Sequence, residues 1–165
     1  MKTTPLTAEH VRLNARMIDF FGFEMPVQYT SIIDEVNCTR RRCGLFDLSH
    51  MGRIEITGPD RLEMAKLAVT KNVKTVPKWA ARYGLLLTVE GTVKDDVLIY
   101  REDEMVHVVV NCSNRARDHE HFLASLLVSR VTRRLPLLDT VQRQACGVVG
   151  VLGGRSNGAY DLCTP

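Results

Sequence analysis

The chain has no apolar segment that approaches the ~20 residues a transmembrane helix requires. Its first residues, Met1–Leu6, contain neither the apolar core of a secretory signal nor the Arg- and Ser-rich composition of an organelle presequence. We therefore expect a cytoplasmic protein with no membrane contact. At 165 residues, with 45% hydrophobic and 25% charged side chains, the chain is long enough for one globular domain or two small ones.

The sequence also lacks the spacings that are typical of metal and nucleotide sites. Its five cysteines include no Cys-x-x-Cys pair. His119 and His121 are two positions apart, rather than the four that bring two ligands to one face of a helix. The glycine-rich segment 147–154 matches neither G-x-G-x-x-G nor a P-loop. We predict no metal site.

Clustered positive charge is absent from most of the chain. From Arg130 onward there are five Arg and two Asp, which accounts for the whole net charge of +3. The preceding 129 residues therefore hold 17 basic and 17 acidic side chains, from totals of 22 and 19. Because nucleic-acid-binding proteins carry a basic face, we predict no nucleic-acid partner.

A hydrolase triad is not expected either. Asp47, Ser49 and His50 are the residue types of such a triad. A strand would place Asp47 and Ser49 on one face and His50 on the other, and no nucleophile-elbow glycines flank the serine. These residues are expected to have ordinary hydrogen-bonding roles.

The order of hydrophobic patterns predicts an α+β fold. Residues 59–127 are predicted to form a helix, three strands and a helix, which favours an antiparallel sheet with helices on one face. Two of the strands form a hairpin around Glu90–Gly91. Asn114 is expected to cap the last helix. Earlier in the chain we predict a short helix from Thr7, a strand and turn at 17–26, a helix capped by Ser31 and a strand ending at Thr57.

Two adjacent carboxylates, Asp95 and Asp96, open the apolar strand that ends at Tyr100. Side chains alternate along a strand, so both acids cannot face water if one face of the sheet is buried. An acid that is turned inward needs a partner, a ligand or a raised pKa. Either one acid of the pair is a functional candidate, or both lie solvated in a turn before the strand.

The motifs taken together resemble the T-protein of the glycine cleavage system, an aminomethyltransferase family. The most specific pieces are Gly44–Gly52 (GLFDLSHMG) and the paired acids in Asp95–Tyr100 (DDVLIY). The other matching pieces stand in the order of the family: Thr4–Leu6 with His10; Met17–Phe20 with Gly22, Met25, Pro26 and Tyr29; Gly58 and Pro59; Tyr83; Gly91; and Val109–Asn111 with Asn114 and Asp118. The resemblance covers residues 4 to about 127.

The resemblance implies the N-terminal portion of a folate-binding, three-domain cloverleaf. Residues 1–57 would belong to its first domain, 58–129 would form an α+β second domain, and 130–165 would be a divergent, poorly ordered tail. The acceptor substrate would be tetrahydrofolate. The donor would be an aminomethyl group on the lipoyl arm of a partner, the H-protein, and ammonia would leave as 5,10-methylenetetrahydrofolate forms.

The resemblance also implies the site residues. Asp96 would be the catalytic carboxylate, in contact with the reacting end of tetrahydrofolate. Met51, Tyr83, Tyr100 and Asn111 would line the folate pocket with it. For Met51 and Tyr100, packing in the core is the alternative role.

The chain departs from the family pattern at several places. Phe23 stands where the family commonly has tryptophan, and Thr92 where it usually has a second glycine. After Leu127 the sequence looks unlike its relatives, which are longer and supply arginines to the folate. We therefore expect a truncated chain that has little or no turnover by itself and that can self-associate through surfaces left exposed.

Two other functions remain open at this point. The first is a folate-binding module of the same superfamily without aminomethyl transfer, although non-catalytic relatives generally do not keep the paired acids. The second is the folate domain of a dimethylglycine or sarcosine dehydrogenase, which carries a flavin domain ahead of this region.

Overall fold

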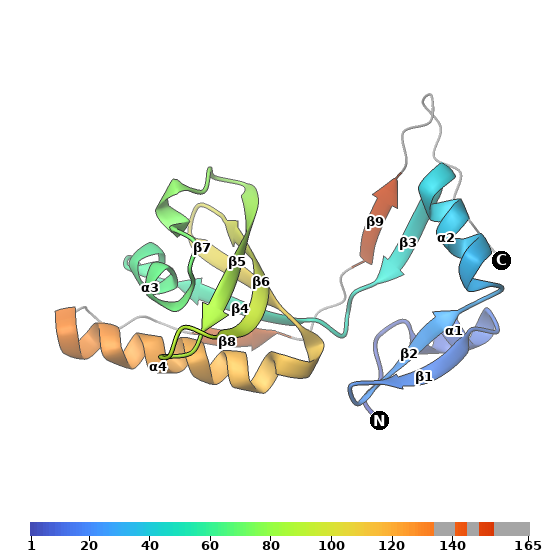
Figure 1. Cartoon of the computed structure of the whole chain (residues 1–165), viewed down its shortest axis with the longest axis horizontal. Helices are drawn as coiled ribbons and strands as arrows, with labels where there is room; N and C mark the ends of the chain where they lie inside the picture. Colours follow the sequence, from blue (N-terminus) through green and yellow to red (C-terminus); the bar gives the residue numbers. More distant parts are fainter. Residues whose placement is uncertain (134–140, 145–148, 154–165) are drawn as a thin grey trace. The chain divides into compact units, whose positions relative to one another are not determined.

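The computed structural model describes residues 1–133, 141–144 and 149–153, and these fall into two compact units (Figure 1). The first unit contains Met1–His50 together with the strand at 149–153, and the second lies within Met51–Ala145. The sequence placed a boundary after residue 57 instead. The difference is the strand Gly52–Thr57 (β4), which pairs with Met105–Val110 (β7) and so belongs to the second unit.

The first unit is built from short elements. Hairpin strands β1 and β2 pair through a turn in which Phe21 and Gly22 have positive φ angles of 51° and 82°. The second helix, α2, begins after Ser31, whose hydroxyl accepts a hydrogen bond from the backbone N–H of Asp34, as predicted. Strand β3 pairs antiparallel with β9. The elements are α1 (Thr7–Arg12), β1 (Arg16–Phe20), β2 (Phe23–Gln28), α2 (Ile32–Arg41), β3 (Cys43–Asp47) and β9 (Val149–Gly153).

The second unit is a five-stranded antiparallel sheet with the strand order β5-β6-β7-β4-β8. The predicted hairpin is β5–β6, and Gly91 in its turn has φ +85°, a conformation that glycine adopts without strain. Besides β4 and β7, the elements are α3 (Arg61–Ala68), η1 (Val73–Thr75), β5 (Ala80–Leu87), β6 (Val93–Arg101), η2 (Cys112–Asn114), α4 (Arg115–Arg133) and β8 (Val141–Gln144).

The core of the second unit lies between one face of the sheet and the helices α3 and α4 (Figure 1). Phe122 and Leu126 of α4 and Met64 of α3 pack there against inward-facing residues of the strands. The strand residues are Ile54, Ile56, Leu86, Val97, Ile99, Val106, Val108 and Val110. The predicted α+β fold, with an antiparallel sheet and helices on one face, is confirmed.

The segment that was expected to be a poorly ordered tail contains regular elements where the structure describes it. Residues 130–133 complete α4, and β8 and β9 follow at 141–144 and 149–153. Residues 134–140 lie outside the described residues.

Close packing at Gly52 yields a test of this fold. A Cβ atom at position 52 would lie 2.6 Å from Cγ2 of Val110 and 2.8 Å from Cγ of Arg115. Gly52→Ala is therefore expected to lower the free energy of unfolding by about 1–3 kcal/mol, the usual cost of overpacking. Urea denaturation would measure this. Lys66→Ala, at an exposed position of α3, should stay within about 0.5 kcal/mol of the wild type, and an equal loss in both variants would contradict the explanation.

Candidate functional site

Strand β6 places the two adjacent acids on opposite faces of the sheet. Asp95 is 5% exposed and faces the helices with Val97 and Ile99, whereas Asp96 is on the exposed face with Leu98 and Tyr100. The alternation predicted from the sequence is confirmed, and the alternative of two solvated acids in a turn is wrong. The buried Asp95 bonds other residues of the fold, and the exposed Asp96 remains accessible.

Asp95 is held by three hydrogen bonds from two asparagines. Its Oδ1 atom accepts from Nδ2 of Asn111 at 2.9 Å and Nδ2 of Asn114 at 2.8 Å, and its Oδ2 atom accepts from the backbone N–H of Asn111 at 3.2 Å. Burial alone would raise the pKa of Asp95, but hydrogen bonds from Asp118, Asn111 and Asn114 lower it overall. Helix α4 begins at Arg115, directly after Asn114, where the sequence predicts its start, and the Asn114 amide donates to Asp95.

The carboxyl group of Asp118, in the first turn of α4, is fully buried beside Asp95. Burial raises its pKa, and the hydrogen bond and negative charge of Asp95 raise it further, to about 8; Arg117 and Lys94 act in the opposite direction. The Nε atom of Arg117 is 3.9 Å from Oδ1 of Asp118, too far for a hydrogen bond. Asp118 is therefore protonated at neutral pH and donates to the ionised Asp95.

Besides burial, two electrostatic effects of opposite sign act on this protonation state. A negative charge in the first turn of a helix is stabilised by about 0.3–1 kcal/mol. Two unit charges about 4 Å apart at an effective dielectric constant of 20 repel by about 4 kcal/mol. The repulsion between the two carboxylates is the larger of these two effects, so it adds to burial, the largest cause, in keeping the proton on Asp118.

Asn111, directly after β7, connects the buried Asp95 to the exposed Asp96. Its Nδ2 atom lies 2.9 Å from Oδ1 of Asp95, 2.9 Å from Oδ1 of Asp96 and 3.2 Å from the Asp96 carbonyl oxygen. Only the amide nitrogen of Asn111 can donate hydrogen bonds to the two carboxylates, and this fixes the orientation of the side chain. The hydroxyl of Tyr83 also interacts with Asp96, and this hydrogen bond raises the pKa of Tyr83.

The structure brings four of the five predicted site residues to one face of β5, β6 and the end of β7. Tyr83 is paired with Leu98, between Asp96 and Tyr100 along β6, and all three polar residues are exposed. Tyr100 also stacks edge-on with His107, with ring centroids 6.2 Å apart. Met51 is half-buried and precedes Gly52, which pairs with Val110, so Met51 lies at the end of the sheet where Asn111 leaves β7.

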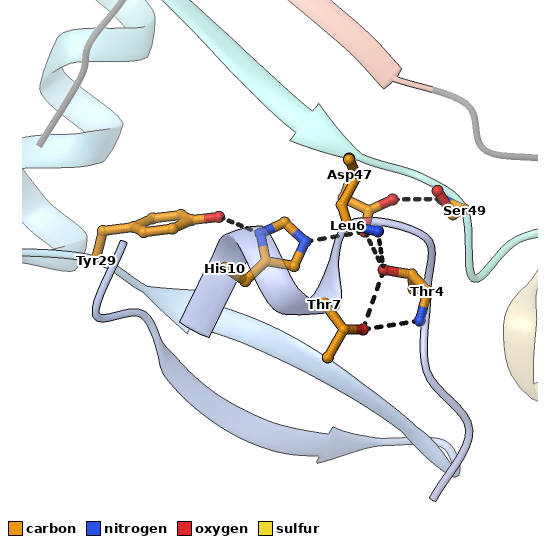
Figure 2. A network of polar contacts seen from close by, with 7 residues as sticks. All are labelled: Thr4, Leu6, Thr7, His10, Tyr29, Asp47 and Ser49. Carbon is orange, nitrogen blue, oxygen red and sulfur yellow. Dashed lines mark hydrogen bonds and ion pairs between the residues drawn. The ribbon is translucent and has the colours of Figure 1, made fainter. Parts of the chain in front are cut away.

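A second polar network lies within the first unit (Figure 2). Oδ2 of Asp47 accepts from the Thr4 hydroxyl at 2.7 Å and lies 2.9 Å from Nε2 of His10, and the Tyr29 hydroxyl is 2.7 Å from Nδ1 of His10. An ionised Asp47 can only accept, so Nε2 of His10 donates to it. The backbone N–H of Ser49 donates to Oδ1 of Asp47 at 2.8 Å.

This network explains why Asp47, Ser49 and His50 form no hydrolase triad. The histidine that bonds Asp47 is His10, and His50 stacks edge-on with Phe20 at 5.5 Å. Burial would raise the pKa of Asp47, but hydrogen bonds from Ser49, His10 and Thr4 lower it to about 2. The arrangement connects the chain before α1, α1 itself, the end of β2 and the end of β3, which indicates a structural role.

Sequence reasoning missed the pairing of Asp95 with Asp118 and the pairing of His10 with Asp47. The residues themselves were visible as motif residues, but nothing in their spacing indicated their partners. Among the described residues, no group of three or more His, Cys, Asp or Glu side chains could hold a metal ion. In the same part of the chain, no helix is both long enough and apolar enough to cross a membrane.

Comparisons with known proteins agree on one family. The model of the GCVT N-terminal domain matches residues 6–157, beyond the point near residue 127 where the resemblance was expected to end. The chain is 45% identical over 121 residues to an aminomethyltransferase of Symbiobacterium thermophilum, covering 73% of the chain and 32% of that protein. It is 46% identical over 120 residues to an aminomethyltransferase of Halothermothrix orenii, covering 72% and 33%.

A solved structure extends the likeness to the fold. The crystal structure of the glycine cleavage system aminomethyltransferase T from Bartonella henselae superposes with a TM-score of 0.82 at 25% identity, covering 92% of this chain and 40% of that one. The fold is thus that of an N-terminal portion of such a protein. The chain spans about a third of the length of the curated relatives it matches.

Proposed function

The chain belongs to the GCVT N-terminal domain family, and from this premise we propose that it carries the acidic wall of a tetrahydrofolate site in an aminomethyltransferase. The reaction would transfer a methylene group from the aminomethyl-lipoyl arm of the H-protein to tetrahydrofolate, with release of ammonia. The observation that carries this proposal is Asp96, an accessible carboxylate held by Asn111 and Tyr83 on the exposed face of the sheet.

The chemistry of the transfer requires an oriented negative charge. Positive charge develops at the one-carbon unit as its bonds to the departing ammonia and to the lipoyl sulfur break and the new C–N bonds to N5 and N10 of tetrahydrofolate form. The protons displaced from N5 and N10 leave with the ammonia and the lipoyl thiol. A carboxylate close to these nitrogens stabilises that charge and orients the amines. Asp96 suits the role because Asn111 fixes its Oδ1 atom at 2.9 Å while the side chain remains exposed.

The neighbours of Asp96 provide surfaces for a flat heterocycle. Tyr83 and Tyr100 are 58% and 38% exposed on the same face of the sheet, and Leu98 lies between them on β6 at 41% exposure. Aromatic rings pack favourably against a planar ligand, and apolar contact area adds to binding. We propose that Tyr83, Tyr100, Asn111 and Met51 contact tetrahydrofolate together with Asp96.

Binding of tetrahydrofolate gives the direct test. Isothermal titration calorimetry is expected to give saturable binding to the wild-type chain, weakened about tenfold or more by Tyr83→Ala, because both the ring and the hydroxyl beside Asp96 are lost. Val89→Ala, in the hairpin turn and 99% exposed, is the control and should bind as the wild type does. Both variants should fold, since both side chains are largely exposed.

The same measurement separates the proposed function from a folate-independent one. No saturable heat from a folded wild-type protein, or equal affinities of the Tyr83→Ala and Val89→Ala variants, would overturn the proposal. Binding without formation of 5,10-methylenetetrahydrofolate from aminomethylated H-protein would instead indicate a folate-binding module.

A further inference from the structure

The Asp95 carboxylate has about four acceptor positions, and only three are filled by the asparagines. Asn111 supplies two donors and Asn114 supplies one, all within 3.2 Å. The remaining neighbour is the carboxyl group of Asp118, which comes from α4 and is fully buried. Helix α4 thus supplies the remaining neighbour of Asp95, the carboxylate that binds Asn111.

We propose that Asp118 is a positioning residue whose carboxyl proton, donated to Asp95, holds that carboxylate where it directs the Asn111 amide onto Asp96. The proposal rests on the proposed function, because it assigns Asp118 to the support of the reacting carboxylate. Asp118 touches neither Asp96 nor the exposed face; it acts through Asp95 and Asn111.

The surroundings of Asp118 support this assignment. In the described part of the chain, no N–H or O–H group donates a hydrogen bond to either of its buried oxygens. A buried carboxylate without donors is strongly disfavoured, whereas a protonated carboxyl group beside Asp95 has an acceptor. The charged groups nearby are Asp95, Arg117 and Lys94, and the two cations do not donate hydrogen bonds to Asp118.

The hydrogen bonds of Asn111 couple the position of Asp95 to that of Asp96 on the exposed face. Its Nδ2 group has two protons and three acceptors within 3.2 Å, one on Asp95 and two on Asp96. If Asp95 shifts or rotates, the amide must give up one of the two carboxylates. Asp96 would then lose the donor that orients it, although its own surroundings on the exposed face are unchanged.

Two substitutions distinguish positioning from simple packing. Asp118→Asn keeps an N–H donor for Asp95 at every pH, and Asp118→Leu keeps a similar volume without a donor. The affinity of the chain for tetrahydrofolate, measured well below the melting temperature, should be within threefold of the wild type for Asp118→Asn. It should be at least tenfold weaker for Asp118→Leu.

The side-chain amide of Asn111 provides a readout that does not depend on folate. In ¹H–¹⁵N spectra of the free protein, its resonances should stay in place in Asp118→Asn, and in Asp118→Leu they should shift and exchange faster with solvent. The pH dependence of stability adds a third readout. The pKa of Asp118 is raised in the fold, so its contribution is fully present below pH 4 and is lost as the pH rises towards 8; Asp118→Asn should remove that decline.

Each result bears on the proposal. A folded Asp118→Leu variant with unshifted Asn111 resonances, or an Asp118→Asn variant as defective as Asp118→Leu, would overturn it. If the wild type does not bind tetrahydrofolate but the Asn111 resonances shift as expected, the proposed function fails and the positioning of Asn111 by Asp118 stands.

Discussion

Replacing Asp96 with asparagine is expected to lower the rate of aminomethyl transfer by about 10²–10⁴-fold, the usual contribution of a positioned acid or base. The asparagine has the same shape but no negative charge to stabilise the developing cation. Folding should be unaffected, because Asp96 is exposed and surface substitutions usually change stability by less than about 0.5 kcal/mol. The loss should therefore appear in the rate and not in the melting temperature.

The assay needs a full-length background, since the relatives are about three times as long as the segment they share with this chain. Residues 4–127 can replace the matching segment of the Symbiobacterium thermophilum aminomethyltransferase, which is 45% identical. The rate of ammonia release from aminomethylated H-protein is then measured with saturating tetrahydrofolate. The control is Glu90→Gln, which removes a charge from an exposed position in the hairpin turn. Equal rates in the Asp96→Asn and Glu90→Gln proteins would exclude a catalytic role for Asp96.

In the first unit, Asp47→Ala is expected to lower the free energy of unfolding by about 3 kcal/mol or more. The substitution leaves Thr4, His10 and the Ser49 N–H without the acceptor they share, and each buried unsatisfied group costs about 1–3 kcal/mol. The Asp47 side chain is only 2% exposed, so water cannot replace it fully. Urea denaturation would measure the loss, and limited proteolysis would show whether the first unit opens.

The pH dependence provides a check on the cause. The pKa of Asp47 is lowered to about 2 in the fold from an ordinary value of 3.8, so its ionised form contributes about 2 kcal/mol above pH 4 that is lost as the pH falls to 2. The difference in stability between the wild type and Asp47→Ala should therefore shrink by about that amount between pH 5 and pH 2. Tyr29→Phe, which removes only the outer hydrogen bond, should cost about 1 kcal/mol at both pH values. A difference that does not change with pH would mean that the charge of Asp47 contributes nothing.

The sequence predicted those parts of the fold that depend on local pattern. The β5–β6 hairpin follows from two alternating segments around Glu90–Gly91, and α2 follows from Ser31 and the apolar positions after it. The opposite orientations of Asp95 and Asp96 follow from the alternation of a strand. Each of these properties is local in sequence, so periodicity and turn chemistry are enough to reveal it.

The candidate site was predicted only in part. Asp96, Tyr83, Tyr100 and Asn111 were chosen because of the family resemblance, and the structure brings them to one face of the sheet; their contact with folate stays a prediction. The sequence placed Asn114 at a helix cap because asparagine is a common N-cap residue. The helix does begin directly after Asn114. The bond of its amide to Asp95, 19 residues earlier in the chain, could not be predicted, because it depends on β6 and the start of α4 meeting there.

By itself, then, the sequence determined the order of elements in residues 59–127, the buried and exposed faces of β6, and the family, since these depend on local periodicity and on motifs. Only the tertiary structure decided which groups share a proton or a hydrogen bond: Asp118 with Asp95, Asn111 with both acids, and His10 with Asp47, 37 residues away. The reason is physical. Protonation and hydrogen bonding are set by what lies within about 3 Å of a buried group, and only the folded path of the chain brings residues so far apart in sequence to that distance.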